Sequence, residues 1–317
     1  MQELPSNKHS DEFDDDIDLK ELFHALLQGK WIILSVTTFV SVIGVIYSLY
    51  LPNIYESKAV LTPVNQSSSI SGALRGYSGL AGLAGISLPS GGNEGNSDKA
   101  LQKIGSLSFF ENSLLSNIYL PNLMAVKSWD YKTNTLDYDK NIFNINSNVW
   151  IRDYSYPRQQ TPTAQESFEV FKTKHLNLVS DKKSGFITLS IKHQSPFVAK
   201  QWVELVVSEI NAYYSQKDKA ESEKAVSYLS QQILKTNLSE IKLVMAELLQ
   251  EETKKLTLIE ANKFYVFEYI DPPVVMEMKS EPIRSIICIL SALFGGMLGL
   301  FIALMKNYFH RKSQPSY

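Results

Sequence analysis

Residues 31–51 read WIILSVTTFVSVIGVIYSLYL and carry no charged side chain. A second charge-free block, residues 285–305, lies near the other end and reads SIICILSALFGGMLGLFIALM. An α-helix rises about 1.5 Å per residue, so about 20 residues cross a hydrocarbon core about 30 Å thick. Both blocks reach this length, and each predicts a transmembrane helix.

Two other interpretations of the blocks fit the sequence less well. The first block could be a signal peptide, but it follows an acidic stretch and no small-residue cleavage site comes after it. The second block could be a buried core helix, but charge-free runs of this length are rare in soluble cores. We therefore expect two membrane spans.

The short flanks of the blocks predict the orientation. Lysine and arginine stand in both flanks, at Lys20, Lys30, Lys306, Arg311 and Lys312. Short basic flanks stay in the cytoplasm, whereas long domains cross the membrane regardless of charge. We expect cytoplasmic tails over residues 1–30 and 306–317, with the long domain, residues 52–284, on the outer side.

Composition and motifs exclude several functional classes. The net charge of −2 gives no basic field for nucleic acid. Cys288 is the only cysteine, so no disulfide can form within the chain. The five histidines have no metal-ligand spacing, and the chain has no G-x-S-x-G motif. The sequence thus predicts no catalytic residue, no metal site and no cofactor. His193 stands beside a predicted strand, and we expect it to lie on the surface.

The segment after the first span begins with alternating, β-rich residues and then becomes rich in glycine, serine and asparagine. Residues 65–99 have no helical or strand period and predict a mobile loop. A phosphate-binding loop would need Gly-Lys-Ser/Thr before a helix, but the only Gly-Lys pair, Gly29-Lys30, precedes Trp31. The expected elements that surround this loop are a strand at 55–64, an amphipathic helix at 100–125, an irregular segment at 126–165, and a short helix with a strand-like tail at 166–180.

A strand and a long helical region follow. Residues 186–191 predict a strand, and Ser195-Pro196 then opens a helix, because serine is a good N-cap and proline suits the first helical position. The helical region, 196–262, would span roughly 100 Å as one helix. Since residues 264–270 predict another strand, we expect a helical hairpin that turns at Thr236–Ser239, with Asn237 or Ser239 as the N-cap.

The segment that leads into the second span contains several prolines. Residues 271–284 include Pro272, Pro273 and Pro282 and end at Arg284. Proline fixes its own φ and disfavours helix in the residue before it. We therefore predict an extended, fairly stiff connector close to the membrane.

Three stretches together resemble the polysaccharide co-polymerase family, the Wzz-type chain length determinants. They are the first span with the strand that follows it, the strand at Ile187–Ile191 with the Ser195-Pro196 helix, and a proline- and glycine-rich signature, roughly P-x2-P-x4-S-P-K and then G-G-M-x-G. Pro273 and Pro282 fit the signature, and Gly295-Gly296-Met297-Leu298-Gly299 matches its glycine part fully. The chain departs from it at three positions: Met276 replaces a proline, Glu281 a serine and Ile283 a lysine.

The resemblance implies an α+β, membrane-anchored protein with two transmembrane helices around a periplasmic α/β base domain and an extended helical hairpin. It implies a bacterial inner-membrane protein that sets the modal length of a surface polysaccharide, typically lipopolysaccharide O antigen, without being an enzyme. The implied partners are further copies of the chain in a ring, a Wzy-type polymerase, undecaprenyl-pyrophosphate-linked glycan and membrane lipid.

Two other functional classes remain open. Some relatives carry a cytoplasmic tyrosine kinase after the second span, but only residues 306–317 follow here, so we expect no built-in kinase. The chain could instead activate a separate kinase in a capsule or exopolysaccharide export system. The other alternative is a periplasmic adapter or sensor, which would normally show one membrane helix or a signalling domain inside.

The glycines of the second block are our candidate packing site. Gly295 and Gly299 stand four residues apart, on one face of the expected helix, with Gly296 beside them. Small residues at this spacing let two membrane helices approach closely. The partner could be Gly44 on the first span, a neighbouring subunit or another protein. The alternative without a packing role is that glycine is simply common in membrane helices.

Overall fold

The computed structural model describes residues 29–64 and 94–312. The chain forms two compact units. One unit contains the helices α2, Lys30–Tyr50, and α10, Arg284–Lys312. The other is a mixed helix and strand unit over Pro52–Glu281. The mixed fold class expected from the sequence is confirmed.

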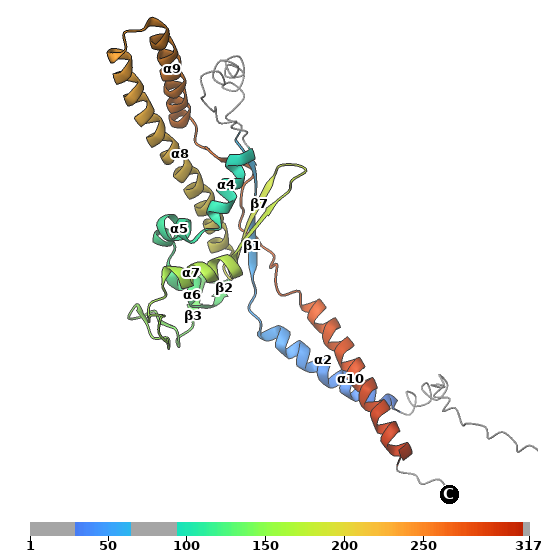
Figure 1. Cartoon of the computed structure of the whole chain (residues 1–317). Helices are drawn as coiled ribbons and strands as arrows, with labels where there is room; N and C mark the ends of the chain where they lie inside the picture. The colour runs from blue at the N-terminus through green and yellow to red at the C-terminus, as the bar shows by residue number, and fades with distance from the viewer. Residues whose placement is uncertain (1–28, 65–93, 313–317) are drawn as a thin grey trace, which may run out of the picture. The chain divides into compact units, whose positions relative to one another are not determined.

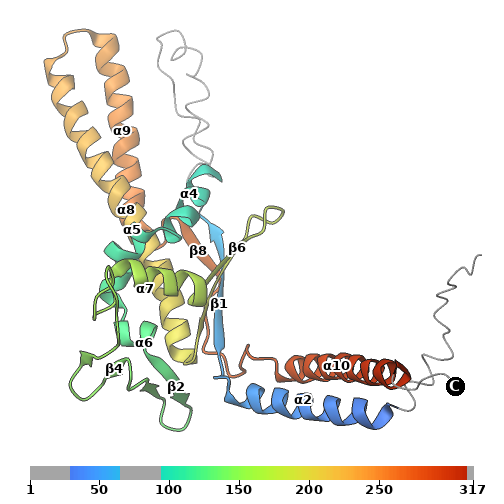
Figure 2. The same ribbon diagram turned by 60° about the horizontal axis from the view of Figure 1, so that its bottom comes forward.

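Both apolar blocks form helices, and α2 and α10 lie side by side (Figures 1 and 2). Each is long and apolar enough to cross a membrane, with mean hydropathies of 2.2 and 2.5. Their outer faces expose large apolar side chains, among them Phe39, Phe294 and Met297. Such faces are typical of helices that contact lipid rather than water. The α10 helix continues past the expected end at 305, to Lys312.

A four-stranded antiparallel sheet organises the second unit, in the order β6-β7-β1-β8. The strands are β1 (Tyr55–Pro63), β6 (Leu176–Ser180), β7 (Ile187–His193) and β8 (Phe267–Asp271). Alternate residues of β1 are buried, because one face of the sheet packs against helices. The same face of β7 is buried, and Ser190 on its other face is buried as well. The strands predicted around 55–64 and 186–191 are therefore confirmed, and the last strand begins three residues later than predicted.

The helical hairpin predicted from the sequence is present. The helix α8, Pro196–Lys235, packs on β1 and β7, and α9, Ser239–Ala261, runs back beside it (Figure 1). Ser195 is the N-cap of α8, with its hydroxyl accepting from the Val198 N–H at 3.5 Å. The predicted N-cap of α9 was wrong, because Leu238 takes the extended cap conformation and Ser239 is already helical.

The predicted helix over 100–125 was wrong as a single element. The structure divides the region into α4 (Glu94–Ile104), α5 (Leu107–Phe109), η1 (Phe110–Leu114), η2 (Leu115–Asn117) and α6 (Leu120–Met124). Gly105 and Ser106 end the first piece, since the Ser106 hydroxyl caps the next helix by accepting from the Phe109 N–H. The predicted loop 65–99 is corrected at its end, where α4 begins at Glu94, and residues 65–93 lie outside the described residues.

The segment expected to be irregular, 126–165, contains two short hairpins. They pair β2 (Val126–Asp130) with β3 (Thr135–Tyr138), and β4 (Phe143–Asn144) with β5 (Val149–Trp150). Each hairpin turns through an asparagine at positive φ, Asn134 at 52° and Asn148 at 53°. Asparagine tolerates this left-handed conformation better than most residues, which makes these turns possible without glycine.

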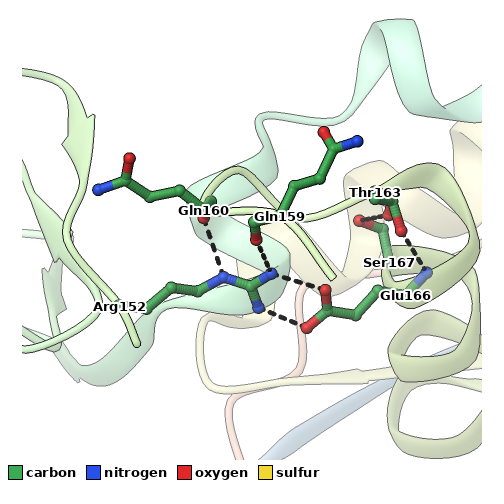
Figure 3. Close-up of polar contacts among 6 residues, drawn as sticks. All are labelled: Arg152, Gln159, Gln160, Thr163, Glu166 and Ser167. Atoms are coloured by element: carbon green, nitrogen blue, oxygen red, sulfur yellow. Dashed lines mark hydrogen bonds and ion pairs between the residues drawn. The ribbon is translucent and has the colours of Figure 1, made fainter. Parts of the chain in front are cut away.

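Arg152 closes the loop that leads from the second hairpin into α7, Ala164–Val170 (Figure 3). Its guanidinium pairs with both carboxylate oxygens of Glu166 and donates to the carbonyls of Gln159 and Gln160. The hydrogen bonds from Arg152 hold the pKa of the Glu166 carboxyl below its usual range. A helical tail, η3 (Phe171–His175), then leads into β6, as the predicted short helix and strand at 166–180 required.

Candidate functional site

The first element of the candidate site is the contact between α2 and α10. A Cβ built on Gly295 would lie 3.0 Å from the Cα of Thr37, and one built on Gly299 would lie 2.9 Å from the Cα of Ile33. A Cβ on Gly44 would overlap the Ser291 side chain. These distances leave no room for a side chain, so both helices depend on missing Cβ atoms for their approach. We call this contact the glycine seam.

The third glycine of the predicted packing group lies differently. A Cβ on Gly296 would find only the Thr37 hydroxyl, at 3.9 Å, which is ordinary van der Waals distance. Gly296 therefore has space for a methyl group, unlike Gly295 and Gly299. The structure brings two of the three predicted glycines against α2, and it pairs Gly44 with a serine rather than with another glycine.

The polar side chains of the glycine seam are satisfied within their own helices. Thr37 donates to the Ile33 carbonyl at 2.7 Å, and Ser291 donates to the Ile287 carbonyl at 2.8 Å. Because each hydroxyl proton is used within its own helix, it is not available for a hydrogen bond to the other helix. The described contacts of the glycine seam are therefore close packing, which is the main source of helix association in lipid.

The second element is where the chain enters and leaves the mixed unit. The Ile54 N–H donates to the Glu281 carbonyl at 2.9 Å, and the Ile54 carbonyl accepts from the Ser280 N–H at 2.8 Å. Farther along, the Ser57 hydroxyl donates to the Val274 carbonyl at 2.8 Å. We call the Ile54–Ser280–Glu281 pairing the clasp, because it fastens the first residues of the unit to its last.

A salt bridge reinforces the clasp. The Lys192 ammonium pairs with the Glu281 carboxylate, and this hydrogen bond raises the pKa of Lys192. Glu281 stands where the family signature has serine, so the departure noted in the sequence provides a partner for Lys192. Both side chains are partly exposed, and such pairs contribute only about 0–1 kcal/mol. The backbone bonds of the clasp therefore matter more than the salt bridge.

The predicted connector residues bracket the clasp. Pro272 and Pro273 directly follow β8, and Pro282 directly follows Glu281. The connector was predicted to end at Arg284, but Arg284 is already the first residue of α10. Residues 272–276 have no helical or strand assignment, which agrees with an extended path; the role of these residues stays a prediction.

Asn211, which the sequence did not single out, connects α8 to the start of β8. Its side-chain carbonyl accepts from the N–H groups of Val266 at 2.7 Å and Phe267 at 3.0 Å, and also from Tyr265 at 3.0 Å. Its amide donates to the carbonyls of Val207 and Phe267. This buried amide ties three consecutive N–H groups at the start of β8 to α8. An asparagine inside an apolar helical stripe is the signal that could have found it.

His193 is buried, so the expected surface position was wrong. Its ring lies 5.0 Å from Trp202 and 5.6 Å from His175, between ring centroids. Nδ1 accepts from the Ser195 N–H at 2.9 Å, so the neutral ring carries its proton on Nε2 and donates to the Asn122 carbonyl at 3.0 Å. Burial lowers the pKa of His193 to about 4 and lowers that of His175 as well. The two rings fasten α6 and the start of α8 to the sheet.

The described part of the chain, 29–64 and 94–312, holds no group of three or more His, Cys, Asp or Glu side chains that could bind a metal ion. The geometry instead consists of packing and backbone pairing. The glycine seam joins the two apolar helices, and the clasp joins the two ends of the mixed unit.

Comparison with known proteins gives a family match in the N-terminal part of the chain. Residues 15–103 match the family model described as "Wzz: Chain length determinant protein". No curated protein matches the chain. Among solved structures, a "full-length bacterial polysaccharide co-polymerase" is similar at a TM-score of 0.41 and 15% identity, covering 94% of this chain and 100% of that one. A fragment of the polysaccharide co-polymerase WzzB from Salmonella Typhimurium is similar at 0.31 and 11% identity, covering 72% and 100%.

Proposed function

Because residues 15–103 match the family model of the Wzz chain length determinants, we propose that the chain regulates the modal length of a surface polysaccharide, specifically lipopolysaccharide O antigen. The family match is the observation that carries the proposal, and it agrees with the resemblance predicted from the sequence. The two long apolar helices, one before and one after the mixed unit in the sequence, support a membrane-anchored protein.

The proposed arrangement places the protein in a bacterial inner membrane. The helices α2 and α10 span the bilayer, residues 1–30 and 306–317 lie in the cytoplasm, and the domain between the spans lies in the periplasm. Basic residues in the short flanks support this orientation.

The proposed activity is regulatory and not catalytic. The partners are further copies of the chain in a ring, a Wzy-type polymerase and the undecaprenyl-pyrophosphate-linked glycan that the polymerase extends. We assign no residue to bond making and no cofactor to the chain. Membrane lipid surrounds the helices of the proposed spans.

The glycine seam and the clasp suggest how such a regulator is held together. The seam fixes α2 against α10, and the clasp ties the two peptide segments that continue from these helices. A change in the packing of the two helices would reach the mixed unit through both segments at one point. This role for Gly295, Gly299 and the connector prolines is part of the proposal.

The test is deletion of the gene and analysis of surface polysaccharide on a gel. The proposal expects polymer to persist while its modal length disappears, and expects the gene on a plasmid to restore the mode. If the chain instead activates a separate kinase, deletion will lower tyrosine phosphorylation in the cell and abolish export of a capsule or exopolysaccharide. That result would overturn the proposal in favour of the export system.

A further inference from the structure

Aromatic side chains gather at the end of the sheet where β1 begins. The ring of Trp129, on β2, lies 5.3 Å from the ring of Tyr55 and 6.3 Å from that of Phe197, between centroids. The Trp129 indole N–H donates to the Asn134 side chain across the hairpin at 3.0 Å, which fixes the indole in this place. The β2–β3 hairpin is thereby held beside the first residue of β1.

The same end of the unit exposes apolar side chains. Tyr131, at the hairpin turn, is 72% exposed, and Phe197, at the start of α8, is 47% exposed. Met278 is 81% exposed and precedes Lys279 and Ser280, which hydrogen-bond to Asn53 and Ile54. Exposed apolar residues are ordinary when they stand alone, but a group on one edge indicates a contact surface.

Chain connectivity limits how far this edge can lie from the spans. Tyr55 follows Leu51 by four residues, a path of about 14 Å at most when fully extended. Glu281 precedes Arg284 by three residues, a path of about 11 Å at most. The clasp joins both paths at Ile54 and Glu281, so the unit is tethered at a single point.

We propose that the tip of the β2–β3 hairpin, together with Phe197, rests on the lipid interface. The inference depends on the proposed membrane spans, and it adds a lipid contact to them. Tryptophan and tyrosine favour the interface, where their rings meet the apolar boundary and their polar atoms meet the headgroups. Lysine stems beside them can extend their ammonium groups toward the headgroups.

The charges of the hairpin favour a neutral contact. Lys127 and Lys132 are balanced by Asp130 and Asp137, so the hairpin has no net charge to attract anionic lipid. The Asp130 carboxylate is also engaged locally, where it accepts from the Lys132 N–H at 2.9 Å and the Thr133 hydroxyl at 2.8 Å. The aromatic rings therefore carry the proposed contact, and we expect little dependence on the fraction of anionic lipid.

The test uses the full chain in lipid vesicles with Cys288→Ala as background, so that one added cysteine carries a fluorophore. The label is placed at Tyr131→Cys, and the matched control is Lys183→Cys in the β6–β7 turn, which is also exposed but lies at the opposite end of the sheet. Vesicles contain phosphatidylethanolamine with a fraction of lipid that carries a quencher just below the headgroup. An unchanged thermal unfolding midpoint shows that each labelled variant is folded.

We expect the lipid quencher to act about twofold or more strongly on the label at 131 than on the label at 183, because only the former lies in the interface. Replacing a third of the phosphatidylethanolamine by phosphatidylglycerol should leave the ratio unchanged. Equal quenching at both positions would overturn the proposal. The proposal would also be overturned if neither the lipid quencher nor an aqueous quencher reached the label at 131. Protein would then cover the hairpin. Polymer length is not measured, so failure here is distinct from failure of the proposed function.

Discussion

Gly299 lies directly against Ile33: a Cβ at Gly299 would come within 2.9 Å of the Ile33 Cα and 3.0 Å of its carbonyl oxygen. Both atoms belong to the backbone of α2, so no side-chain rotation can make room. The nearest neighbours of Gly295 include the Thr37 Cα, at 3.0 Å. The fit of the two helices therefore depends on these two glycines in a way that can be tested residue by residue.

Substitution of the seam glycines should loosen the helix pair. We expect Gly295→Leu with Gly299→Leu to insert into the membrane normally, because leucine favours the bilayer, but to separate α2 from α10. Disulfide crosslinking between cysteines placed on the two helices should fall, and polymer of unregulated length should appear on gels at near-normal protein level.

Two controls separate packing from a general effect of mutation. Gly296→Ala changes the same residue type but meets only the Thr37 hydroxyl at 3.9 Å, so it should keep the modal length. Leu293→Ala with Met297→Ala alters side chains that are 61% and 69% exposed, and it should do much less than the double leucine variant. Normal length control in the double leucine variant would reduce the seam glycines to common membrane-helix residues.

Reporter fusions test the proposed topology. Fusions at Asp15 and Pro315 should report the cytoplasm, and a fusion at Trp150 should report the periplasm, because the short basic flanks of the spans remain inside. Alkaline phosphatase and a cytoplasm-active fluorescent protein provide opposite signals at each site. Phosphatase activity from the fusion at Pro315 would contradict the two-span arrangement.

Asn211 should be among the most sensitive residues of the mixed unit. Asn211→Leu removes the acceptor for the buried N–H groups of Val266 and Phe267, and we expect the free energy of unfolding to fall by about 2–4 kcal/mol. Asn112→Ala is the matched control, since Asn112 is exposed and makes one bond to the carbonyl four residues earlier. Denaturant unfolding followed by fluorescence measures both. Equal stability of the two variants would mean that the Asn211 bonds are replaced when they are lost.

Stability should fall in acid because of His193. Burial lowers the pKa of this imidazole to about 4, whereas the unfolded chain has the ordinary value near 6.5. The unfolded state therefore binds the proton first: stability is full above about pH 6.5 and is lost as the pH falls toward 4, with roughly 3 kcal/mol as an upper bound. Protonation of Nδ1 would also break the hydrogen bond that this atom accepts from the Ser195 N–H. The unfolding midpoint measured from pH 7.5 to 4 should follow this curve in the wild type, and His193→Gln should flatten it. An equally steep curve in the variant would assign the acid sensitivity to other groups, such as the buried His175.

Much of the fold follows from local sequence patterns. The charge-free blocks predict α2 and α10, alternation predicts β1 and β7, and Ser195-Pro196 predicts the start of α8. The break in the helical hairpin was also placed correctly, at Thr236–Leu238, although its N-cap was not. These elements depend on residues within a turn or a strand of one another, and local patterns report such relations well.

The features that sequence missed depend on long-range contacts. His193 is buried because α6 supplies the Asn122 carbonyl from another part of the chain. Asn211 acts on backbone groups more than fifty residues away, at Val266 and Phe267. The seam glycines were predicted as a packing face, but their partner was left open, because spacing along one helix does not identify the helix that lies against it. The contact of Gly295 with Thr37 comes from the structure alone.

The most direct test of the proposed function measures amount and length of polymer in the same cells. Surface polysaccharide is labelled with a radioactive sugar in the deletion strain, with and without the gene on a plasmid, and the label is quantified along the gel. We predict that total incorporated sugar stays within about twofold while the modal peak is lost on deletion and returns with the plasmid, because a regulator that forms no bonds changes the distribution and not the chemistry. Complete loss of polymer on deletion, or an unchanged modal peak, would contradict the account.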